Sequence, residues 1–245
     1  MTVTWEELGW ERLAAGVGRC RLPGWDCTVG LVVGDGVALL VDAGSSLGEG
    51  GRLRTQAQRL AGHRVTHLAL THPHFDHVFG AAAFAGAEVY GPVGMDAVFA
   101  YEREELRADA VRNGLDPASA EEAVDALVHP RHLVSGEWTL GLDGGRQVLL
   151  ANVGPAHTAH DLVVLVPGEA PGEREVVFCG DLVEESGEPQ AGPDAVPAQW
   201  PAALDRLLDL GGEDALYVPG HGAVVDAEFV RRQRDALAAR FGVSG

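Results

Sequence analysis

Short apolar stretches alternate with segments of helical period along most of this chain. Apolar runs of strand length, about four to eight residues, predict buried or half-buried strands. We expect strands at residues 19–22, 28–33, 37–41, 68–70, 88–90, 133–140, 147–151, 162–166, 175–179 and 216–218. Apolar residues at helical spacing predict helices at residues 45–61, 76–84, 198–210 and 226–241, and a longer helical region at about 92–128.

The helical region at 92–128 is predicted to be broken once. Asn113-Gly114 interrupts its period, and Asp116-Pro117 provides the N-cap and the N1 proline of a new helix. Its surface is acidic, with glutamates at 102, 104, 105, 121 and 122. We expect an insert that acts as a lid or as a dimer surface, and an ordinary pair of surface helices is the alternative.

The order of the predicted elements indicates one α/β domain over residues 1–245. Residues 19–41 form an antiparallel meander with Gly34-Asp35-Gly36 as a tight turn. Residues 133–140 and 147–151 are expected in a second sheet, joined by a turn at residues 143–145. A length of 245 residues is enough for a large buried core, and no low-complexity linker divides the chain.

Charge and composition narrow the functional classes. The formal net charge is −18, which argues against nucleic acid as a partner because a phosphate backbone requires a basic track. All 18 basic residues are arginine. The three cysteines are an odd number without CxxC spacing, so neither a disulfide framework nor a structural zinc site is expected. No signal peptide or membrane-spanning run is visible, so we expect a cytoplasmic protein without membrane contact.

The densest polar cluster directly follows the predicted strand at 68–70. His72, His74, Asp76 and His77 lie within six positions, and Pro73 places them on a loop by stopping regular strand pairing. Imidazole and carboxylate groups are ligands of borderline and hard divalent ions. A solvated histidine-rich loop is the alternative. It is weakened because other strands also end in such groups, at Asp42, His157, Asp181 and His221.

The order of these motifs resembles the metallo-β-lactamase-fold hydrolase superfamily. That family carries a His-x-His-x-Asp-His motif, then a single His, a Gly-Asp and a late Gly-His, and the match runs from about residue 28 to about residue 225. The resemblance implies a four-layer αβ/βα sandwich of two mixed β-sheets flanked by helices. It also implies that the insert at 92–128 falls where relatives roof the active site.

The resemblance further implies two metal sites that share a carboxylate. A carboxylate can bridge two ions because it has two oxygens, whereas one imidazole nitrogen cannot. The first site would use His72, His74, His157 and Asp181, and the second would use Asp76, His77, Asp181 and His221. Asp42 and Asp161 are expected to support these ligands from behind. Trp25 and His160 are expected near the substrate, with a packing tryptophan and a surface imidazole as the alternatives.

Together these features predict a dinuclear metal-dependent hydrolase that uses a metal-bridging hydroxide, oriented by Asp76, on a small ester, lactone, thioester or amide. Two divalent ions are expected, with Zn²⁺ first and Mn²⁺ or iron as alternatives. A small-molecule substrate is the expected partner, and a homodimer remains open. The alternatives are a mononuclear iron oxidoreductase of the same fold, similar to persulfide dioxygenases, and a non-catalytic metal-binding member.

Overall fold

A computed structural model describes residues 3–170 and 172–243. The remaining positions of the predicted domain, residues 1–2, 171 and 244–245, lie outside the described part. The first sheet runs in the order β1 to β7, and its strands are antiparallel up to β4 and parallel from β4 to β7. These strands are β1 (Glu11–Ala14), β2 (Val17–Arg21), β3 (Thr28–Val33), β4 (Ala38–Val41), β5 (His67–Ala69), β6 (Glu88–Pro92) and β7 (His132–Val134).

The second sheet has the order β12-β11-β10-β9-β8, and only the β11–β12 pair within it is parallel among the described strands. Its strands are β8 (Glu137–Leu142), β9 (Arg146–Asn152), β10 (Leu162–Val166), β11 (Val176–Glu184) and β12 (Leu216–His221). Both sheets are therefore mixed, as the sequence predicted.

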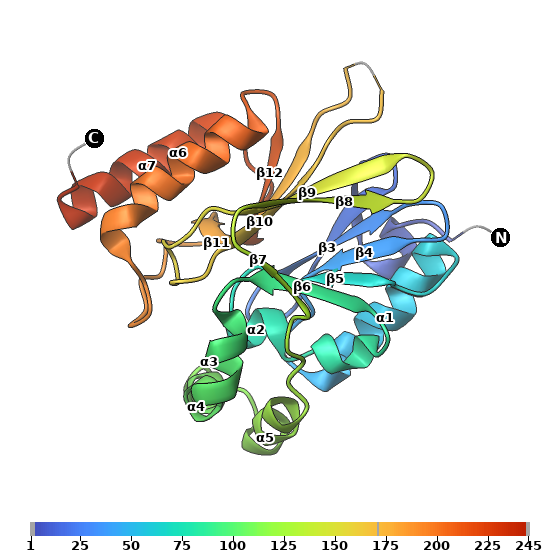
Figure 1. Ribbon diagram of the computed structural model, residues 1–245, viewed down its shortest axis with the longest axis horizontal. Coiled ribbons are helices and arrows are strands. Elements are labelled where there is room, and N and C mark those ends of the chain that lie inside the picture. Colours follow the sequence, from blue (N-terminus) through green and yellow to red (C-terminus); the bar gives the residue numbers. More distant parts are fainter. Residues whose placement is uncertain (1–2, 171, 244–245) are drawn as a thin grey trace.

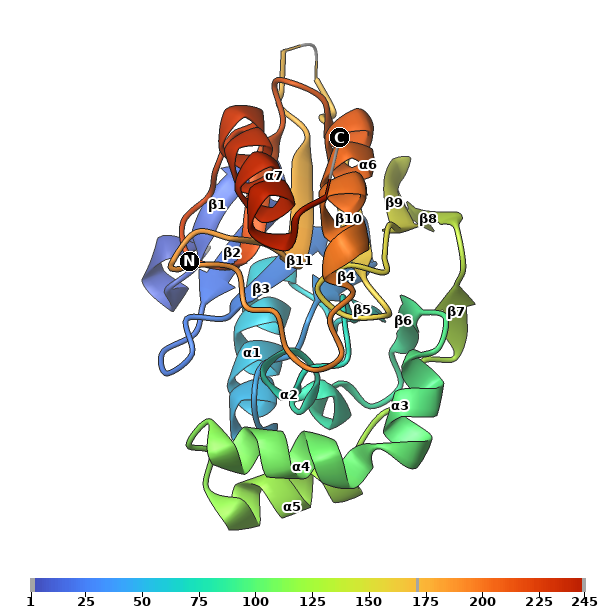
Figure 2. The same ribbon diagram turned by 90° about the vertical axis from the view of Figure 1, so that its left-hand side faces the viewer.

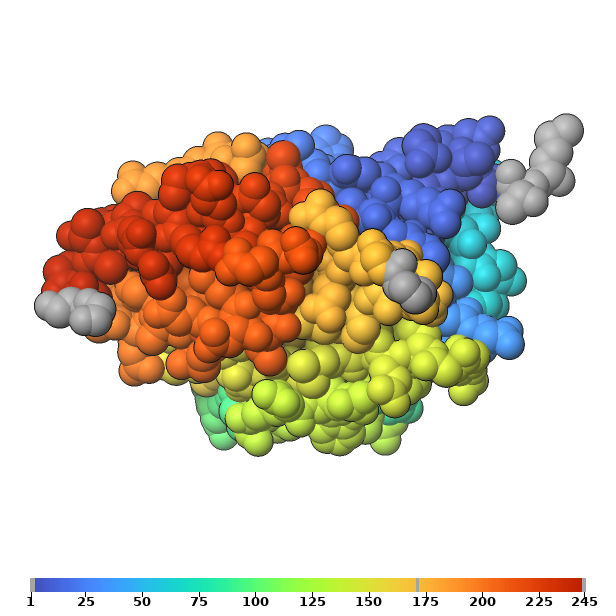
Figure 3. Space-filling view, turned by 90° about the horizontal axis from the view of Figure 1, so that it is seen from above, coloured from blue at the N-terminus to red at the C-terminus, as the bar shows by residue number. Residues whose placement is uncertain are grey.

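Helices cover the outer face of each sheet (Figure 1). The first sheet carries α1 (Leu47–Ala61), α2 (Phe75–Val78), α3 (Met95–Tyr101), α4 (Arg103–Arg112) and α5 (Pro117–Asp125), and the second carries α6 (Trp200–Gly211) and α7 (Ala227–Phe241). Short 3₁₀ turns lie at Glu6–Leu8, Ala81–Phe84 and Pro197–Gln199. Seen from above, the C-terminal helix in red and the N-terminal strands in blue are both visible on this face of the molecule (Figure 3). The four-layer αβ/βα sandwich is confirmed.

Strand alternation explains the layers, because successive side chains of a strand point to opposite faces of the sheet. In β4, Leu39 and Val41 face the core between the sheets, where they join Val164 and Phe178 of the second sheet. Leu40 of the same strand faces the helical layer instead. A third apolar cluster lies between the second sheet and α6–α7, so the two sheets are buried on both faces.

Several sequence predictions of single elements are wrong. Residues 133–140 do not form one strand: the chain leaves the first sheet after β7, turns at Ser135-Gly136 and enters the second sheet as β8. Residues 76–84 do not form one helix either, because α2 ends at Val78 and a 3₁₀ turn begins at Ala81. Between them, Gly80 lies so close to the Ala43 carbonyl that a side chain at this position would collide with it.

The region predicted as a helical insert contains three helices, α3, α4 and α5. The predicted break at Asn113-Gly114 separates α4 from α5, and Asp116 caps α5 by accepting the Ser119 N–H at 3.0 Å. Figure 2 shows α4 and α5 stacked beyond α2, on the side of the molecule that also carries the loop leading into α6. Among the described residues, no helix has the length and apolar character that crossing a membrane requires.

Candidate metal centre

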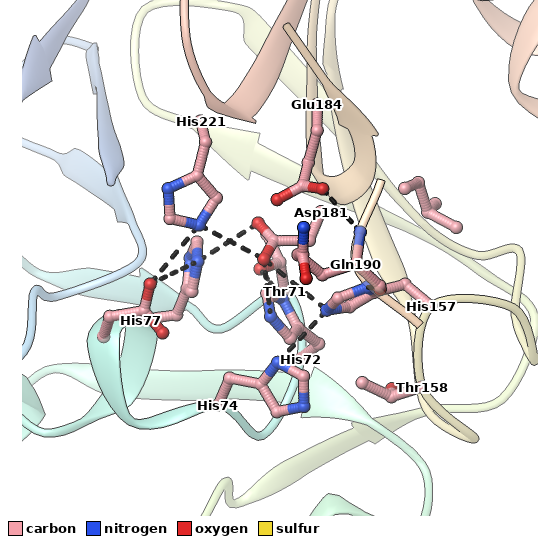
Figure 4. Close-up of polar contacts among 12 residues, drawn as sticks. Thr71, His72, His74, His77, His157, Thr158, Asp181, Glu184, Gln190 and His221 are labelled. Carbon is pink, nitrogen blue, oxygen red and sulfur yellow. Dashed lines mark hydrogen bonds and ion pairs between the residues drawn. The ribbon is translucent and has the colours of Figure 1, made fainter. Parts of the chain in front are cut away.

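Strand ends and loops of both sheets bring seven predicted ligands together, and Figure 4 labels all of them except Asp76. Parallel strands place their carboxyl ends at one edge of a sheet, and loops at that edge carry polar groups without breaking strand pairing. The seven residues follow β5, link β9 to β10, lie within β11 or end β12: His72, His74, Asp76, His77, His157, Asp181 and His221.

In one half of this centre, three imidazoles surround an oxygen of Asp181. His157 Nε2 lies 3.1 Å from His74 Nδ1. Asp181 Oδ2 lies 3.6 Å from His72 Nε2 and 3.5 Å from His157 Nε2. The nitrogen and oxygen atoms of this group all lie within 4.8 Å of one another, which is compatible with a single ion at their centre.

The other half is richer in carboxylates. Asp181 Oδ1 lies 3.2 Å from His77 Nε2, and Asp181 Oδ2 lies 3.2 Å from His221 Nε2. Asp76 Oδ2 lies 3.3 Å from His221 Nε2 and 3.6 Å from His77 Nε2. Asp181 therefore reaches both halves, while Asp76 belongs to the second half only.

The ring nitrogens that face away from the centre are all engaged. His157 Nδ1 lies 3.0 Å from the Gln190 carbonyl, and His221 Nδ1 lies 2.7 Å from the Trp25 carbonyl. The other three contacts are His72 Nδ1 with Thr71 Oγ1 at 2.9 Å, His74 Nε2 with Asp194 Oδ2 at 3.0 Å, and His77 Nδ1 with Asp42 Oδ2 at 2.8 Å. Carbonyl and carboxylate oxygens only accept hydrogen bonds, so the rings they hold donate outward.

The fifth ring is oriented through Asp42. Thr71 donates its backbone N–H to Asp42 Oδ1 at 2.8 Å and its hydroxyl to Asp42 Oδ2 at 2.9 Å. Because the hydroxyl proton is used there, Thr71 Oγ1 accepts from His72 Nδ1. In their neutral forms, all five imidazoles thus direct a lone pair into the centre, which is the arrangement that a metal ligand requires.

The buried atoms at the centre fit a bound cation. His72 Nε2, His77 Nε2 and Asp181 Oδ1 have no hydrogen-bond partner among the described residues. Leaving a buried polar atom unpaired costs about 1–3 kcal/mol, more for a charged group. Lone pairs that face one another, such as His74 Nδ1 and His157 Nε2, repel unless a metal ion or a proton lies between them. The donor set of imidazole and carboxylate suits zinc, manganese or iron.

Burial and charge affect the two halves differently. Burial lowers the pKa of His157 to about 4 and that of His72 well below its ordinary value. Burial also opposes protonation of His221, but Asp181 and Asp76 outweigh it and raise its pKa to about 12. Burial opposes protonation of His77 as well, but Cys27 and the carboxylates of Asp181, Asp76 and Asp42 outweigh it and raise its pKa. The second half therefore carries a strong negative potential.

Two glycines permit the close approach of the strands that carry Asp181 and His221. Gly180 has a positive φ of 54°, where the β11–β12 register shifts, and a side chain there would meet Thr71 Oγ1. A side chain at Gly220 would collide with Asp181 Oδ1. β11 does not end at Cys179, as the sequence predicted, but continues through this irregularity to Glu184. The bend directs Asp181 into the centre.

Comparison with known proteins agrees with the geometry. The family model described as the metallo-β-lactamase superfamily matches residues 22–221. The chain belongs to the metallo-β-lactamase superfamily. The metallo-β-lactamase domain-containing protein 1 of Xenopus laevis is 30% identical over 203 residues, which cover 80% of this chain and 71% of the relative.

Solved metallo-β-lactamases share the fold. The enzyme from Pontibacter korlensis superposes with a TM-score of 0.70 at 20% identity, covering 93% of this chain and 97% of that one. FIM-1 from Pseudomonas aeruginosa, in a mono-zinc form, has a TM-score of 0.68 at 20% identity and covers 96% of each chain. Members of this superfamily are mostly metal-dependent hydrolases, and the fold with these candidate ligands implies divalent metal binding.

The residues predicted to support this superfamily site lie close to it. Asp161 accepts hydrogen bonds from the Ala156 N–H at 2.9 Å and from the Thr158 hydroxyl at 2.9 Å, so it braces the loop that carries His157. Burial raises the pKa of Asp161 to about 7. His160 lines the cavity beside His74. Trp25 is half-buried against Phe75 and donates its indole N–H to the Asn113 carbonyl at 3.1 Å.

Sequence reasoning missed several neighbours of this superfamily site. Asp194 and the Gln190 carbonyl orient His74 and His157 from the loop between β11 and α6. No spacing rule points to them, because they lie on an irregular loop far along the chain. Cys27 Sγ lies 3.9 Å from His77 Nδ1. That nitrogen faces Asp42, away from the other ligands, so the thiol is a neighbour of the site and outside its ligand shell.

Proposed function

We propose that this chain is a dinuclear metal-dependent hydrolase of a small ester, lactone, thioester or amide. The observation that carries the proposal is the position of Asp181 between two sets of imidazoles whose lone pairs face inward. His72, His74 and His157 would hold one ion with Asp181, and Asp76, His77 and His221 would hold the second with the same carboxylate. The mono-zinc form of FIM-1 supports zinc as the first candidate.

Two divalent ions held in this way would supply a Lewis acid for the substrate carbonyl and a hydroxide nucleophile at neutral pH. The protein's own contribution is orientation. Asp76 approaches His77 and His221 through Oδ2, and no hydrogen bond among the described residues engages its Oδ1. Asp76 Oδ1 can therefore accept a hydrogen bond from a water molecule, orient that water for attack and hold its proton.

The surroundings of the centre favour a small substrate. A cavity of about 470 Å³ borders His74, a volume within the usual range for small-molecule sites. The formal charge of −18 disfavours nucleic acid as a substrate.

The first test is the metal content of protein purified without an affinity tag or chelator, by elemental analysis. About two zinc ions per chain, together with turnover of an ester, lactone and thioester panel, would support the proposal. One iron per chain, with oxygen consumption in the presence of persulfides, would instead favour the oxidoreductase. Protein that takes up no metal after reconstitution would contradict both readings.

The role of Asp76 is tested by Asp76→Asn. We expect a fall in kcat of about 10²–10⁴-fold, the usual range for loss of a positioned base. Asp209→Asn makes the same chemical change on the exposed face of α6 and serves as the matched control. Circular dichroism should show both variants folded. Full activity in Asp76→Asn would exclude the orienting role.

A further inference from the structure

A buried glutamate at the end of β11 holds the loop that follows this strand. The Glu184 side chain is buried, although the four residues after it are exposed. Its Oε2 accepts the backbone N–H of Gln190 at 2.7 Å, which closes residues 185–189 into a short loop. Figure 4 shows this bond beside His157. Gln190 is therefore held directly from the end of the strand.

The backbone of Gln190 uses both of its polar groups. Its N–H donates to Glu184, and its carbonyl accepts from His157 Nδ1 at 3.0 Å. The Gln190 side chain takes part in neither contact, since it is exposed and its amide donates to the Glu188 carbonyl at 2.9 Å. The position of the Gln190 carbonyl therefore depends on where Glu184 holds the backbone.

Glu184 is itself fixed from α7. The buried Gln233 side chain accepts the Glu184 N–H at 3.1 Å and donates to the Leu182 carbonyl at 2.8 Å. Burial and the charge of Asp181 raise the pKa of the Glu184 carboxyl to about 7. An oxygen of either the neutral or the ionised form can accept a hydrogen bond, so the acceptor is present throughout the neutral pH range.

The Gln190 carbonyl determines which nitrogen of His157 carries the proton. A carbonyl oxygen only accepts hydrogen bonds, so it holds the ring proton on Nδ1 and leaves the lone pair of Nε2 for a metal. Trp200 packs edge-to-face against this ring at 5.4 Å between centroids, which restricts its position but not its tautomer. Without the carbonyl, the proton can occupy Nε2, where it competes with a metal ion.

We propose that Glu184 is a positioning residue for the first half of the metal centre, which contains His157. It holds Gln190 so that the Gln190 carbonyl fixes both the orientation and the tautomer of the His157 ring. Glu184 is not one of the candidate ligands. The inference rests on the proposed function for its effect on metal binding, whereas the hydrogen bonds themselves require no metal.

The first experiment compares Glu184→Met with Glu184→Gln. Both variants remove the charge at similar volume, but only glutamine keeps an oxygen that can accept the Gln190 N–H. Zinc affinities are measured by competition with a fluorescent chelator at pH 7. We expect Glu184→Met to bind the first ion about tenfold or more weakly than Glu184→Gln, and the second ion equally. Equal affinities for the first ion would overturn the inference.

Two controls separate positioning from a general loss of structure. Gln190→Ala keeps the backbone N–H and carbonyl, so it should bind both ions like the wild type. If it weakens the first ion as much as Glu184→Met does, the Gln190 side chain is responsible and the inference is wrong. If Glu184→Met, compared with Glu184→Gln, weakens both ions equally and unfolds at a lower urea concentration, Glu184 has only a structural role.

A tautomer measurement distinguishes this inference from the proposed function. The ring ¹⁵N chemical shifts of His157 are recorded by NMR at pH 7 in metal-free protein, where burial keeps this ring neutral because it lowers the pKa to about 4. The signals are assigned by their absence in His157→Ala. We expect the Nδ1–H tautomer in the wild type and in Glu184→Gln, and a mixture of both tautomers in Glu184→Met.

The outcomes of this measurement are independent of turnover. If no ester, lactone or thioester is hydrolysed but the tautomer of His157 depends on Glu184 as predicted, the hydrolase proposal fails and the positioning role stands. If substrates are hydrolysed but the His157 signals are the same in the three proteins, the positioning role is wrong and the hydrolase proposal stands.

Discussion

The two halves of the candidate metal centre use similar ligands but differ in how they are held and charged. In the first half, His72 and His157 are oriented by a hydroxyl and a backbone carbonyl, and burial lowers the pKa of both rings. In the second half, His77 and His221 face carboxylates that outweigh burial and raise their pKa values. His74 is an exception in the first half, because Asp194 outweighs burial and raises its pKa.

This difference indicates an order of metal binding. His72 and His157 are neutral at pH 7, so they offer lone pairs without first losing a proton. The raised pKa values of His77 and His221 mean that a metal competes with protons for these rings, and this competition reduces its apparent affinity. We therefore expect the first half to hold an ion more tightly than the second at neutral pH.

The largest effect should come from deleting one ligand in each half. His221→Ala should retain about one ion per chain, bound by the first half. His157→Ala should lose that tighter ion. Substituting a residue that only hydrogen-bonds to a ligand usually weakens metal binding about 10–100-fold, and removing a ligand should weaken it more. Competition with a fluorescent zinc chelator at pH 7 measures both affinities.

The matched control for this pair is His129→Ala, which removes an imidazole that packs edge-to-face against Phe99 and is not one of the candidate ligands. It should bind two ions like the wild type. Equal losses of zinc affinity in His157→Ala and His221→Ala would mean that the two halves bind their ions with equal affinity. The difference in pKa between the halves would then not set an order of metal binding.

A smaller effect is expected behind the second half, from Asp42→Asn. Asp42 has a φ of 63°, a conformation that asparagine tolerates, so the backbone is preserved. The new amide can present an N–H to His77 Nδ1, where the ring now donates to a carboxylate. We expect about 10–100-fold weaker binding of the second ion only, measured by the same chelator competition.

Asp35→Asn is the control for this change, because Asp35 lies in an exposed turn on the same meander. Its two affinities should match those of the wild type. Weakened binding of the first ion in Asp42→Asn would show that Asp42 acts mainly through Thr71 and His72. Asp42 would then orient ligands of both halves, His77 directly and His72 through Thr71.

The sequence was sufficient to predict the part of the site that consists of residues at the ends of strands. Each of the seven predicted ligands comes after an apolar strand or within a motif of fixed spacing, and the structure brings all seven together. The strand pattern predicted an α/β domain, whereas the four-layer arrangement of two mixed sheets came from the resemblance to the superfamily. Their roles as ligands remain predictions that the metal analysis tests.

What could not be predicted depends on contacts between distant segments. Gln190 and Asp194 reach the site only because the loop between β11 and α6 passes over it, which no local pattern encodes. The change of sheet at Ser135-Gly136 has the same origin, since 133–140 is a continuous strand by local pattern. Apolar period identifies a strand but does not say which sheet will pair with it.

The smallest effect should follow Trp25→Phe, which tests whether the second half depends on a backbone atom. His221 Nδ1 contacts the Trp25 carbonyl, which the substitution retains, whereas the indole bond to the Asn113 carbonyl is lost. We expect unfolding free energy to fall by about 1 kcal/mol, measured in urea, with two ions still bound. Trp138→Phe, at an exposed tryptophan of β8, is the control.

Loss of the second ion in Trp25→Phe alone would mean that the insert, through the indole, holds the Trp25 carbonyl in place. A fall in kcat/KM with the metal content and stability unchanged would instead assign the indole to the substrate.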